Sequence, residues 1–136
     1  MKLRIITPKK KVLEEEIEAV TLPSIEGEIT ILPNHVSLFS LLKEGVVKIK
    51  YEKKEDFLAI GGGYVETNGE YVNILVSRAY GQDEINQTAT EKAIKEAEEN
   101  LKKAKTIEER MQAASLLRRS IVDLKLLKKR KRTTIS

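Results

Sequence analysis

The pattern of apolar and polar positions changes its period once along this chain, close to residues 80–81. Before that point the chain consists of short runs, alternating or wholly apolar, and each run ends at a turn residue. Runs of this kind predict β-strands. They cover residues 17–22, 28–32, 46–51, 57–60, 64–67 and 71–76. Because no helical pattern interrupts them, they predict a β-sandwich or a barrel.

The strongest turn signal is the dipeptide Asn68-Gly69, which separates the last two runs. Asn-Gly favours a type I′ turn, because both central residues of that turn need a positive φ. The sequence therefore predicts a tight antiparallel β-hairpin at this point.

After residue 81 the apolar residues recur every three or four positions, which is typical of a helix with one apolar face. Thr88, with Glu91 three residues later, has the spacing of a capping box and is expected to open the first helix. The apolar stripe of this helix consists of Ala93, Ala97, Leu101 and Ala104.

A second helix is expected to begin almost at once, because Thr106 and Glu109 repeat the capping-box spacing. Only a couple of residues around Lys105 separate the two helices, and so short a link predicts an antiparallel hairpin. The stripe on the second helix is expected to consist of Ala114, Leu117, Ile121 and Leu124.

The predicted seam of the first helix is mainly alanine. Alanine buries little area, so at ~25 cal/mol per Å² the two helices gain modest packing energy. Two interpretations stay open: a hairpin that is loosely committed to one conformation, and a hairpin that is thin but stable.

The composition excludes several kinds of site. The chain has no cysteine and a single histidine, His35, which rules out disulfides, thiolate metal sites and multi-histidine metal cages. The N-terminal apolar stretch is too short for a signal peptide, and no window approaches the ~18 apolar residues of a membrane span. We therefore expect no direct membrane insertion, and a chain that is cytosolic or held at a membrane only through partners.

The net charge of +4 is concentrated near the C-terminal end. Residues 110–136 carry nine basic side chains and one acidic side chain, Asp123, and residues 128–132 are all basic. This basic end fits a nucleic-acid arm, a solvated helix end that favours the macrodipole, or a contact for an acidic protein surface. No aromatic residue follows Tyr80, whereas binders of single strands usually interleave aromatic residues. The three interpretations stay open at this stage.

Two further features have a structural and a functional interpretation. Gly61-Gly62-Gly63 leads into a strand and not into the helix that a phosphate-binding loop needs, so a bend or bulge is expected. His35 follows Pro33-Asn34 without a recognisable nucleophile motif, and it is expected to be a turn or packing residue.

The carboxylates Glu26 and Glu28 flank Gly27 on a turn that is expected to be exposed. General acid–base catalysis needs two carboxyl groups that converge on a pocket, and nothing in the pattern shows such convergence. We expect no catalytic residue, no metal site and no cofactor in this chain.

Residues 24–38, Ser-Ile-Glu-Gly-Glu-Ile-Thr-Ile-Leu-Pro-Asn-His-Val-Ser-Leu, resemble a motif of the epsilon subunit of F-type ATP synthases. The family stretch is Ser-Glu-Gly-Glu-hydrophobic-Gly-Ile-hydrophobic-Pro-Gly-His-x-Pro-Leu. The resemblance continues through residues 42–45, 59–66 and 72–76, and the chain length and the order of strands and helices agree with the family. The resemblance therefore covers essentially the whole chain.

The resemblance implies an antiparallel β-sandwich in residues 1–81 and a regulatory helical hairpin with a basic end in residues 82–136. The sandwich would bind the gamma subunit and the ring of c subunits, on the central stalk at the cytoplasmic face of the membrane. The hairpin would move between a folded position and an extended one that reaches the alpha and beta subunits and restrains ATP hydrolysis. Such a subunit couples proton or sodium flow to ATP synthesis and is not an enzyme by itself.

The resemblance also gives several residues a role in binding partners. Glu28 matches the carboxylate on the loop that meets the c ring, and His35 matches the histidine after the turn. The beta subunits of the family carry an acidic segment, but one exposed ion pair contributes only ~0–1 kcal/mol, so several basic side chains would act together. The candidate contacts are Glu26, Glu28, His35, Arg118, Arg119, Lys125, Lys128, Lys129 and Arg130.

The chain departs from the family where the first helix begins. Some bacterial members bind ATP there through Ile/Leu-Asp-x-x-Arg-Ala, but Asn86, Ala89 and Thr90 replace the acid, the arginine and the alanine. We therefore expect weak or absent ATP binding. The main alternative function is a nucleic-acid-binding module that uses the basic end, with affinity dominated by phosphate contacts. A small hydrolase built around His35 is the third alternative.

Overall fold

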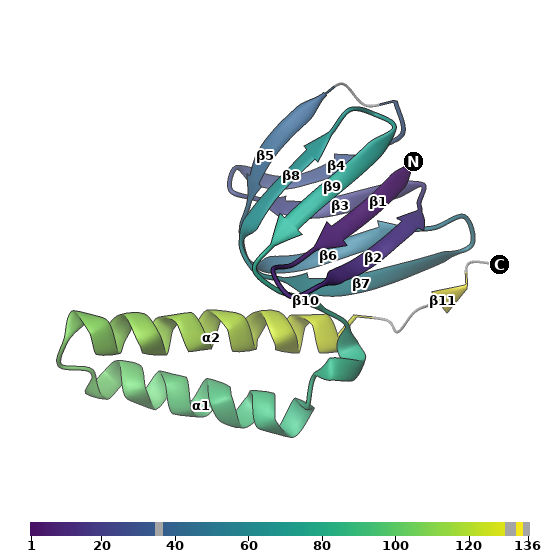
Figure 1. The fold of residues 1–136 in the computed structure, drawn as a ribbon. Helices are drawn as coiled ribbons and strands as arrows, with labels where there is room; N and C mark the ends of the chain where they lie inside the picture. The colour runs from purple at the N-terminus through teal and green to yellow at the C-terminus, as the bar shows by residue number, and fades with distance from the viewer. Residues whose placement is uncertain (35–36, 130–132, 135–136) are drawn as a thin grey trace.

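The computed structural model in Figure 1 is a β-sandwich with a helical hairpin that projects from one end of it. The structure describes residues 1–34, 37–129 and 133–134. The strands are β1 (Lys2–Ile6), β2 (Lys11–Glu16), β3 (Ala19–Ser24), β4 (Gly27–Ile31), β5 (Leu38–Leu42), β6 (Gly45–Lys50), β7 (Lys54–Ile60), β8 (Gly63–Thr67), β9 (Tyr71–Val76), β10 (Ala79–Tyr80) and β11 (Thr133–Thr134). The helices are the 3-10 helix η1 (Gln82–Glu84), α1 (Gln87–Lys103) and α2 (Ile107–Leu127).

The strands form one continuous sheet that folds over into two layers. Its order is β10-β7-β6-β3-β5-β8-β9-β1-β2, with β4 paired to β3 and β11 paired to β7. Strands β3 and β5 share only the pair Ser24 and Leu42, so the sheet turns from one layer into the other there. Strands β5, β8, β9, β1 and β2 form the layer nearer the viewer in Figure 1. All described pairings are antiparallel except that of β1 with β9.

The core lies between the two layers and follows from the alternation of apolar residues. In β9, for example, Val72 and Ile74 are fully buried while Tyr71 is exposed, because successive side chains of a strand point to opposite faces. The largest fully buried side chains in the sandwich are Leu3, Ile5, Val20, Leu22, Ile31, Val47, Ile49, Ile60, Val65, Val72 and Ile74. The predicted fold class, a β-sandwich followed by a two-helix hairpin, is confirmed, and all six predicted runs contain strands.

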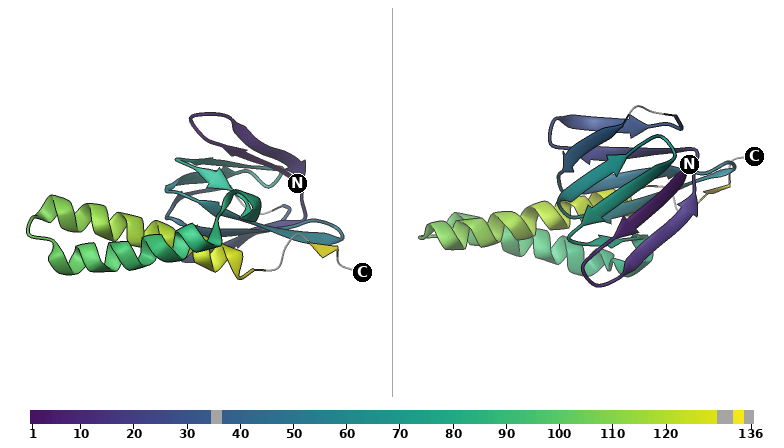
Figure 2. Two further views of the ribbon diagram at one scale, coloured as in Figure 1. Left: turned by 90° about the horizontal axis from the view of Figure 1, so that it is seen from below. Right: turned by 45° about the horizontal axis from the view of Figure 1, so that its top comes forward.

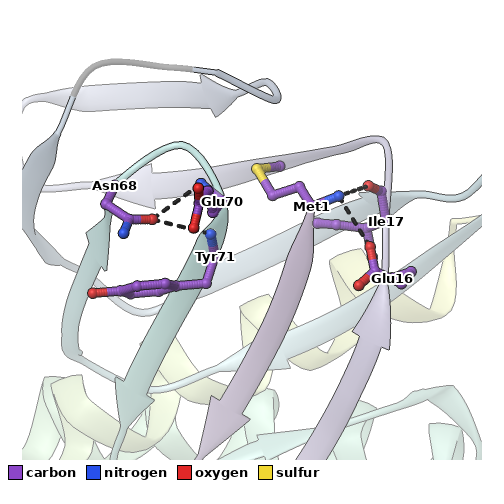
Figure 3. Close-up of polar contacts among 6 residues, drawn as sticks. All are labelled: Met1, Glu16, Ile17, Asn68, Glu70 and Tyr71. Carbon is purple, nitrogen blue, oxygen red and sulfur yellow. Dashed lines mark hydrogen bonds and ion pairs between the residues drawn. The ribbon is translucent and has the colours of Figure 1, made fainter.

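The turn at Asn68-Gly69 joins β8 to β9 as predicted, but it is not of type I′. Only Gly69 has a positive φ (93°), and Asn68 is not among the non-glycine residues with positive φ. The Asn68 side-chain oxygen instead accepts hydrogen bonds from the backbone N–H groups of Glu70 and Tyr71, at 3.0 and 3.2 Å (Figure 3). The side chain of Asn68 therefore completes a wider turn, which removes the need for a second positive φ.

The first helix begins two residues earlier than predicted. The N-cap is Asn86, whose side-chain oxygen accepts from the backbone N–H of Ala89 at 2.9 Å, so Thr88 lies inside the first turn. The predicted cap of the second helix is confirmed, since Thr106 Oγ1 accepts from the N–H of Glu109 at 3.1 Å. The Glu109 carboxylate in turn accepts from the N–H of Lys105 at 3.0 Å.

The seam between the helices is correct for α1 but shifted on α2. Ala97 is fully buried, whereas Ile121 is 50% exposed, which contradicts its predicted place in the seam. Ala113 and Ser120 are buried instead, one position earlier than Ala114 and Ile121. Because Ser120 is polar, the apolar pattern of the sequence selects Ala114 and Ile121 instead. The predicted stripe therefore lies one position, or about 100° around the helix, from the buried one.

Candidate functional site

The most prominent surface feature of the sandwich is a row of apolar side chains across four neighbouring strands. Leu41 of β5 pairs with Tyr64 of β8, Tyr64 pairs with Leu75 of β9, and Leu75 pairs with Ile6 of β1. Because paired residues point to the same face, these four side chains lie side by side on the outer face of the layer. We call them the apolar row.

The apolar row is extended by an aromatic contact. Phe39, two residues before Leu41 in β5, is 61% exposed, and its ring lies 5.2 Å from that of Tyr64 at 31°. Leu41 itself is 50% exposed. Half-exposed apolar side chains in a contiguous group mark an interaction surface more often than isolated ones do.

A groove of about 420 Å³ continues the apolar row towards the end of β1. It is lined by Ile6, Thr7, Pro8, Gly62, Gly63, Tyr64, Leu75, Val76 and Ser77. A Cβ on Gly63 would lie 1.9 Å from the carbonyl oxygen of Leu75, and one on Gly61 would lie 2.1 Å from Ser77 Oγ. These two glycines allow neighbouring chain segments to approach closely, and the expected bend of the glycine run lies at Gly62.

Glu26 lies on the turn between β3 and β4, as predicted, whereas Glu28 is the second residue of β4 and pairs with Pro23. Ser24 Oγ donates to the carbonyl of Gly27 at 2.6 Å and accepts from the N–H of Glu26 at 3.2 Å, which fixes the turn. Gly27 has a φ of 126°, a conformation that residues with a side chain rarely adopt. Both carboxylates are exposed, and Ile25 in the turn is 57% exposed.

The family motif includes Glu28 near the start of β4 and the segment at Asn34 after its end. Glu28 and Asn34 are six positions apart, so even a fully extended chain at ~3.3 Å per residue places them at most about 20 Å from one another. The N–H of Asn34 donates to the carbonyl of Gly69, so this segment lies by the β8–β9 turn, at the end of the sandwich away from the helices (Figure 1). His35, the predicted contact next to Asn34, lies outside the described residues.

The same end of the sandwich is tied together by the first residue of the chain. The amino group of Met1 donates to the Glu16 carboxylate at 3.1 Å and to the carbonyl of Ile17 at 3.3 Å (Figure 3). Glu16 is largely exposed, so we attach little stability to its ion pair.

The basic candidates on α2 do not form one patch. Arg119 lies over the Tyr80 ring, 6.0 Å from its centroid, and Lys129 lies over the Phe57 ring at 5.6 Å. Both basic side chains therefore contact the sandwich. Arg118, Lys125 and Lys128 are exposed. Arg130 lies outside the described residues.

Tyr80 joins the end of β10 to the second helix. Its hydroxyl donates a hydrogen bond to the carboxylate of Asp123, the one acidic residue of the basic C-terminal region. Burial, followed by this hydrogen bond, raises the pKa of Tyr80 above its ordinary value, so the phenol stays protonated. The sequence pattern marks Asp123 as unusual by its charge, but it does not identify Tyr80 as its partner.

A second groove, of about 370 Å³, lies between the start of α1 and the second half of α2. Asn86, Ala89 and Arg119 are among the residues that line it. The side-chain oxygen of Asn86 is already engaged in capping α1, and Ala89 has no functional group. Weak or absent ATP binding stays a prediction.

The free energy of unfolding is expected to depend on pH through Asp56 in β7. Burial raises the pKa of its carboxyl; a hydrogen bond from the N–H of Phe57 opposes the rise, and the charges of Glu15 and Asp83 add to it. The folded chain therefore binds more protons than the unfolded chain between the two pKa values of Asp56. Over that window the free energy of unfolding falls as the pH rises.

The substitution Asp56→Asn is expected to raise the free energy of unfolding at pH 7 by up to about 1 kcal/mol, because the partly exposed site is screened by solvent. Below the ordinary aspartate pKa the gain should disappear, since the native side chain is then protonated as well. Urea unfolding at several pH values measures this, with the exposed Glu52→Gln as control. An equal gain at every pH would contradict the charge explanation.

Comparisons with known proteins identify the family. The family model "ATP synthase, Delta/Epsilon chain, beta-sandwich domain" matches residues 1–82. The ATP synthase epsilon chain of Herpetosiphon aurantiacus is 35% identical over 133 residues, which are 96% of each chain. This chain belongs to the epsilon-subunit family of F-type ATP synthases.

Other relatives match over most of this chain. The ATP synthase epsilon chain of Dehalococcoides mccartyi is 36% identical over 135 residues, 97% of this chain and 95% of the relative. A chain in the mitochondrial ATP synthase of Euglena gracilis, in a structure of its OSCP, F1 and c-ring parts, has a TM-score of 0.82 at 26% identity, over 90% of this chain and 78% of its own. A chain from the central stalk and c-ring of the Tetrahymena thermophila enzyme, 19% identical with a TM-score of 0.68, shows the fold alone.

In residues 1–34, 37–129 and 133–134 no group of three or more His, Asp or Glu side chains is placed to hold a metal ion. No helix within these ranges is long and apolar enough to span a bilayer.

Proposed function

We propose that this epsilon chain is a non-catalytic rotor subunit on the central stalk of a proton- or sodium-translocating F-type ATP synthase. It couples ion flow to ATP synthesis, and its C-terminal helices restrain ATP hydrolysis. Epsilon chains that match through both the sandwich and the hairpin support this proposal. So does the likeness to a chain in the F1 and c-ring assembly of Euglena gracilis.

The observation that carries the proposal is the apolar row. A contiguous group of partly exposed apolar side chains on a flat sheet suits a lasting contact with another protein better than a small substrate, which binds in a concave pocket. We assign the gamma subunit to this surface. The adjoining groove beside Gly62 and Gly63 is open to one apolar side chain of the partner.

The remaining contacts are assigned to other subunits. Ile25 and Glu26 on the β3–β4 turn, and Glu28 at the start of β4, are proposed to meet the c ring, and His35 stays a proposed partner contact. Arg118 and Lys125 on α2 and Lys128 just after it are exposed, and they are proposed, together with Arg119, Lys129 and Arg130, to contact the alpha and beta subunits when the hairpin extends. The chain would then lie at the cytoplasmic face of the membrane, held there by other subunits and without contact to nucleic acid.

The test is ATP hydrolysis by a complex of alpha, beta and gamma subunits, titrated with the whole chain and with a chain truncated after Tyr80. The whole chain is expected to bind and to lower the hydrolysis rate several-fold, whereas the truncated chain should bind without this effect. Circular dichroism of the truncated chain controls for loss of the sandwich.

Each outcome of the titration decides one part of the proposal. If neither form binds, the central-stalk role is wrong. If both forms lower hydrolysis equally, the hairpin is not the restraining element. If restraint depends on charge, moderate salt should weaken it in the whole chain, because salt screens exposed ion pairs.

A further inference from the structure

A second row of side chains runs beside the apolar row on the outer face of the same layer. Phe39 of β5 pairs with Glu66 of β8, Glu66 pairs with Asn73 of β9, and Asn73 pairs with Arg4 of β1. Each of these residues lies two positions from a member of the apolar row on its own strand, so both rows point to the same face. The two rows therefore form one surface, with an apolar half next to a largely polar half.

This surface is open in the described structure. The contacts of α2 with the sandwich are mainly with β6 and β7, which belong to the other layer. In Figure 1 and in the right view of Figure 2, β8, β9 and β1 face the viewer, and neither α1 nor α2 crosses in front of them. A partner can therefore reach both rows while the helices stay where they are.

Glu66 is exposed on this surface and has no ion pair within the part of the chain that the structure describes. Its Oε1 accepts a hydrogen bond from Asn73 Nδ2 at 3.3 Å, which holds the carboxylate in place. The cation of the same row is already paired, since Arg4 Nε lies 3.7 Å from Glu14 Oε2 on β2. The negative charge of Glu66 is thus available to a cation from outside the chain.

Two aromatic rings lie next to this carboxylate. The rings of Phe39 and Tyr64 are 5.2 Å apart and tilted by 31°. Phe39 is the cross-strand partner of Glu66, about 5 Å away between the Cβ atoms, and Tyr64 precedes Glu66 by two positions on the same face. Because Phe39 is 61% exposed, its ring is accessible from solvent.

A carboxylate beside accessible aromatic rings suits a guanidinium group. The planar guanidinium of arginine donates two N–H groups to one carboxylate, and it also stacks on aromatic rings. Each carboxylate oxygen accepts more than one hydrogen bond, so the contact of Glu66 with Asn73 leaves room for such a pair. A lysine ammonium would satisfy the charge but has no flat face that stacks.

We propose that Phe39, Tyr64 and Glu66 form a receptor for one arginine side chain of the protein that docks on the apolar row. We call these three residues the guanidinium site. The inference rests on the function proposed above, because it takes the gamma subunit as the docking protein. An apolar row across four strands allows a partner to shift along it, whereas one charge pair near its β5–β8 end fixes the position and orientation of that partner.

The test removes the charge of Glu66 and keeps its shape. Glu66→Gln retains the oxygen that accepts from Asn73, and calorimetry with purified gamma subunit measures the dissociation constant. We expect binding to be about tenfold weaker or more, because the partner's guanidinium then lies against a neutral amide. Glu52→Gln makes the same change at an exposed position of the β6–β7 turn, in the other layer, and should stay within about twofold of the native affinity.

Two further measurements separate a stacked arginine from other contacts. Phe39→Leu keeps an apolar side chain but removes the ring, and it should weaken binding about fivefold if a guanidinium stacks there. The affinity of the native chain should also fall more steeply with added salt than that of Glu66→Gln, because the variant has one charge pair fewer.

Unchanged affinity in Glu66→Gln, or a loss equal to that in Glu52→Gln, would show that no cation of gamma occupies the guanidinium site. A loss in Glu66→Gln without one in Phe39→Leu would rule out a stacked arginine. If the native chain does not bind gamma, the proposed function fails together with the site, whereas tight binding by the native chain and all variants overturns the site alone. Circular dichroism shows whether Glu66→Gln stays folded; if it does not, Phe39→Leu decides in its place.

Discussion

Gly63→Ala is expected to destabilise the sandwich by about 3 kcal/mol or more, at the upper end of what overpacking of a folded core costs. The new Cβ would lie 1.9 Å from the Leu75 carbonyl oxygen and 2.7 Å from the Cα of Val76. Both atoms belong to the backbone of β9, which pairs with β8 at this point. Relief of the clash therefore requires the two strands to separate, and not merely a side chain to rotate.

The neighbouring glycine provides a matched control. A Cβ on Gly62 would lie 3.6 Å from the carbonyl oxygen of Leu42, which is an ordinary contact. Gly62→Ala is thus expected to change the free energy of unfolding by less than about 1 kcal/mol, in either direction. Urea unfolding followed by circular dichroism compares the two variants. Equal effects would show that the glycine run does not serve close approach of β8 and β9.

The second large effect is expected on binding and not on folding. Leu41→Asp is expected to weaken binding to the gamma subunit by about 30-fold or more, because a charge introduced into an apolar contact costs at least about 2 kcal/mol. Leu41 is 50% exposed in the isolated chain, so the fold should lose little stability. Calorimetry with purified gamma subunit measures the dissociation constant.

A second apolar-to-aspartate change controls for charge alone. Ile107 is 76% exposed at the start of α2 and lies on the hairpin, away from the apolar row. Ile107→Asp should leave the affinity for gamma within about twofold, a change well below that of one interface hot spot. Unchanged affinity in Leu41→Asp would remove the apolar row as the gamma-binding surface and leave the family assignment untouched.

Local patterns were most reliable where the backbone and the nearest side chains decide the structure. The capping signal at Thr106 and Glu109 and the alternation in β9 involve residues a few positions apart, and both predictions are confirmed. The cap at Asn86 was missed because two capping residues, Asn86 and Thr88, compete within three positions. The predicted type of the turn at Asn68 is wrong because the Asn68 side chain accepts a hydrogen bond that closes a wider turn. A second residue with positive φ is then not needed.

The predicted contact residues show the same contrast between features that neighbouring residues decide and features that they do not. Glu26 lies on an exposed turn as predicted, because Gly27 and Ser24 define that turn locally, whereas Glu28 is exposed but belongs to β4. The seam of α2 was misplaced because a buried serine, Ser120, carries no apolar signal. The predicted division after residue 81 and the partner contacts themselves stay predictions.

The sequence by itself determined six of the strands, the helical hairpin that follows them and the family, because periodicity, caps and contiguous motifs are properties of neighbouring residues; it gave no run for β1, β2, β5 or β10. Only the tertiary structure decided which of these residues meet. It aligned Leu41, Tyr64, Leu75 and Ile6 into one surface through the register of four strands. It also brought Gln82 to the end of α2, 44 positions further along the chain. Such contacts depend on how the layers and helices pack, and that packing leaves no periodic pattern in the chain.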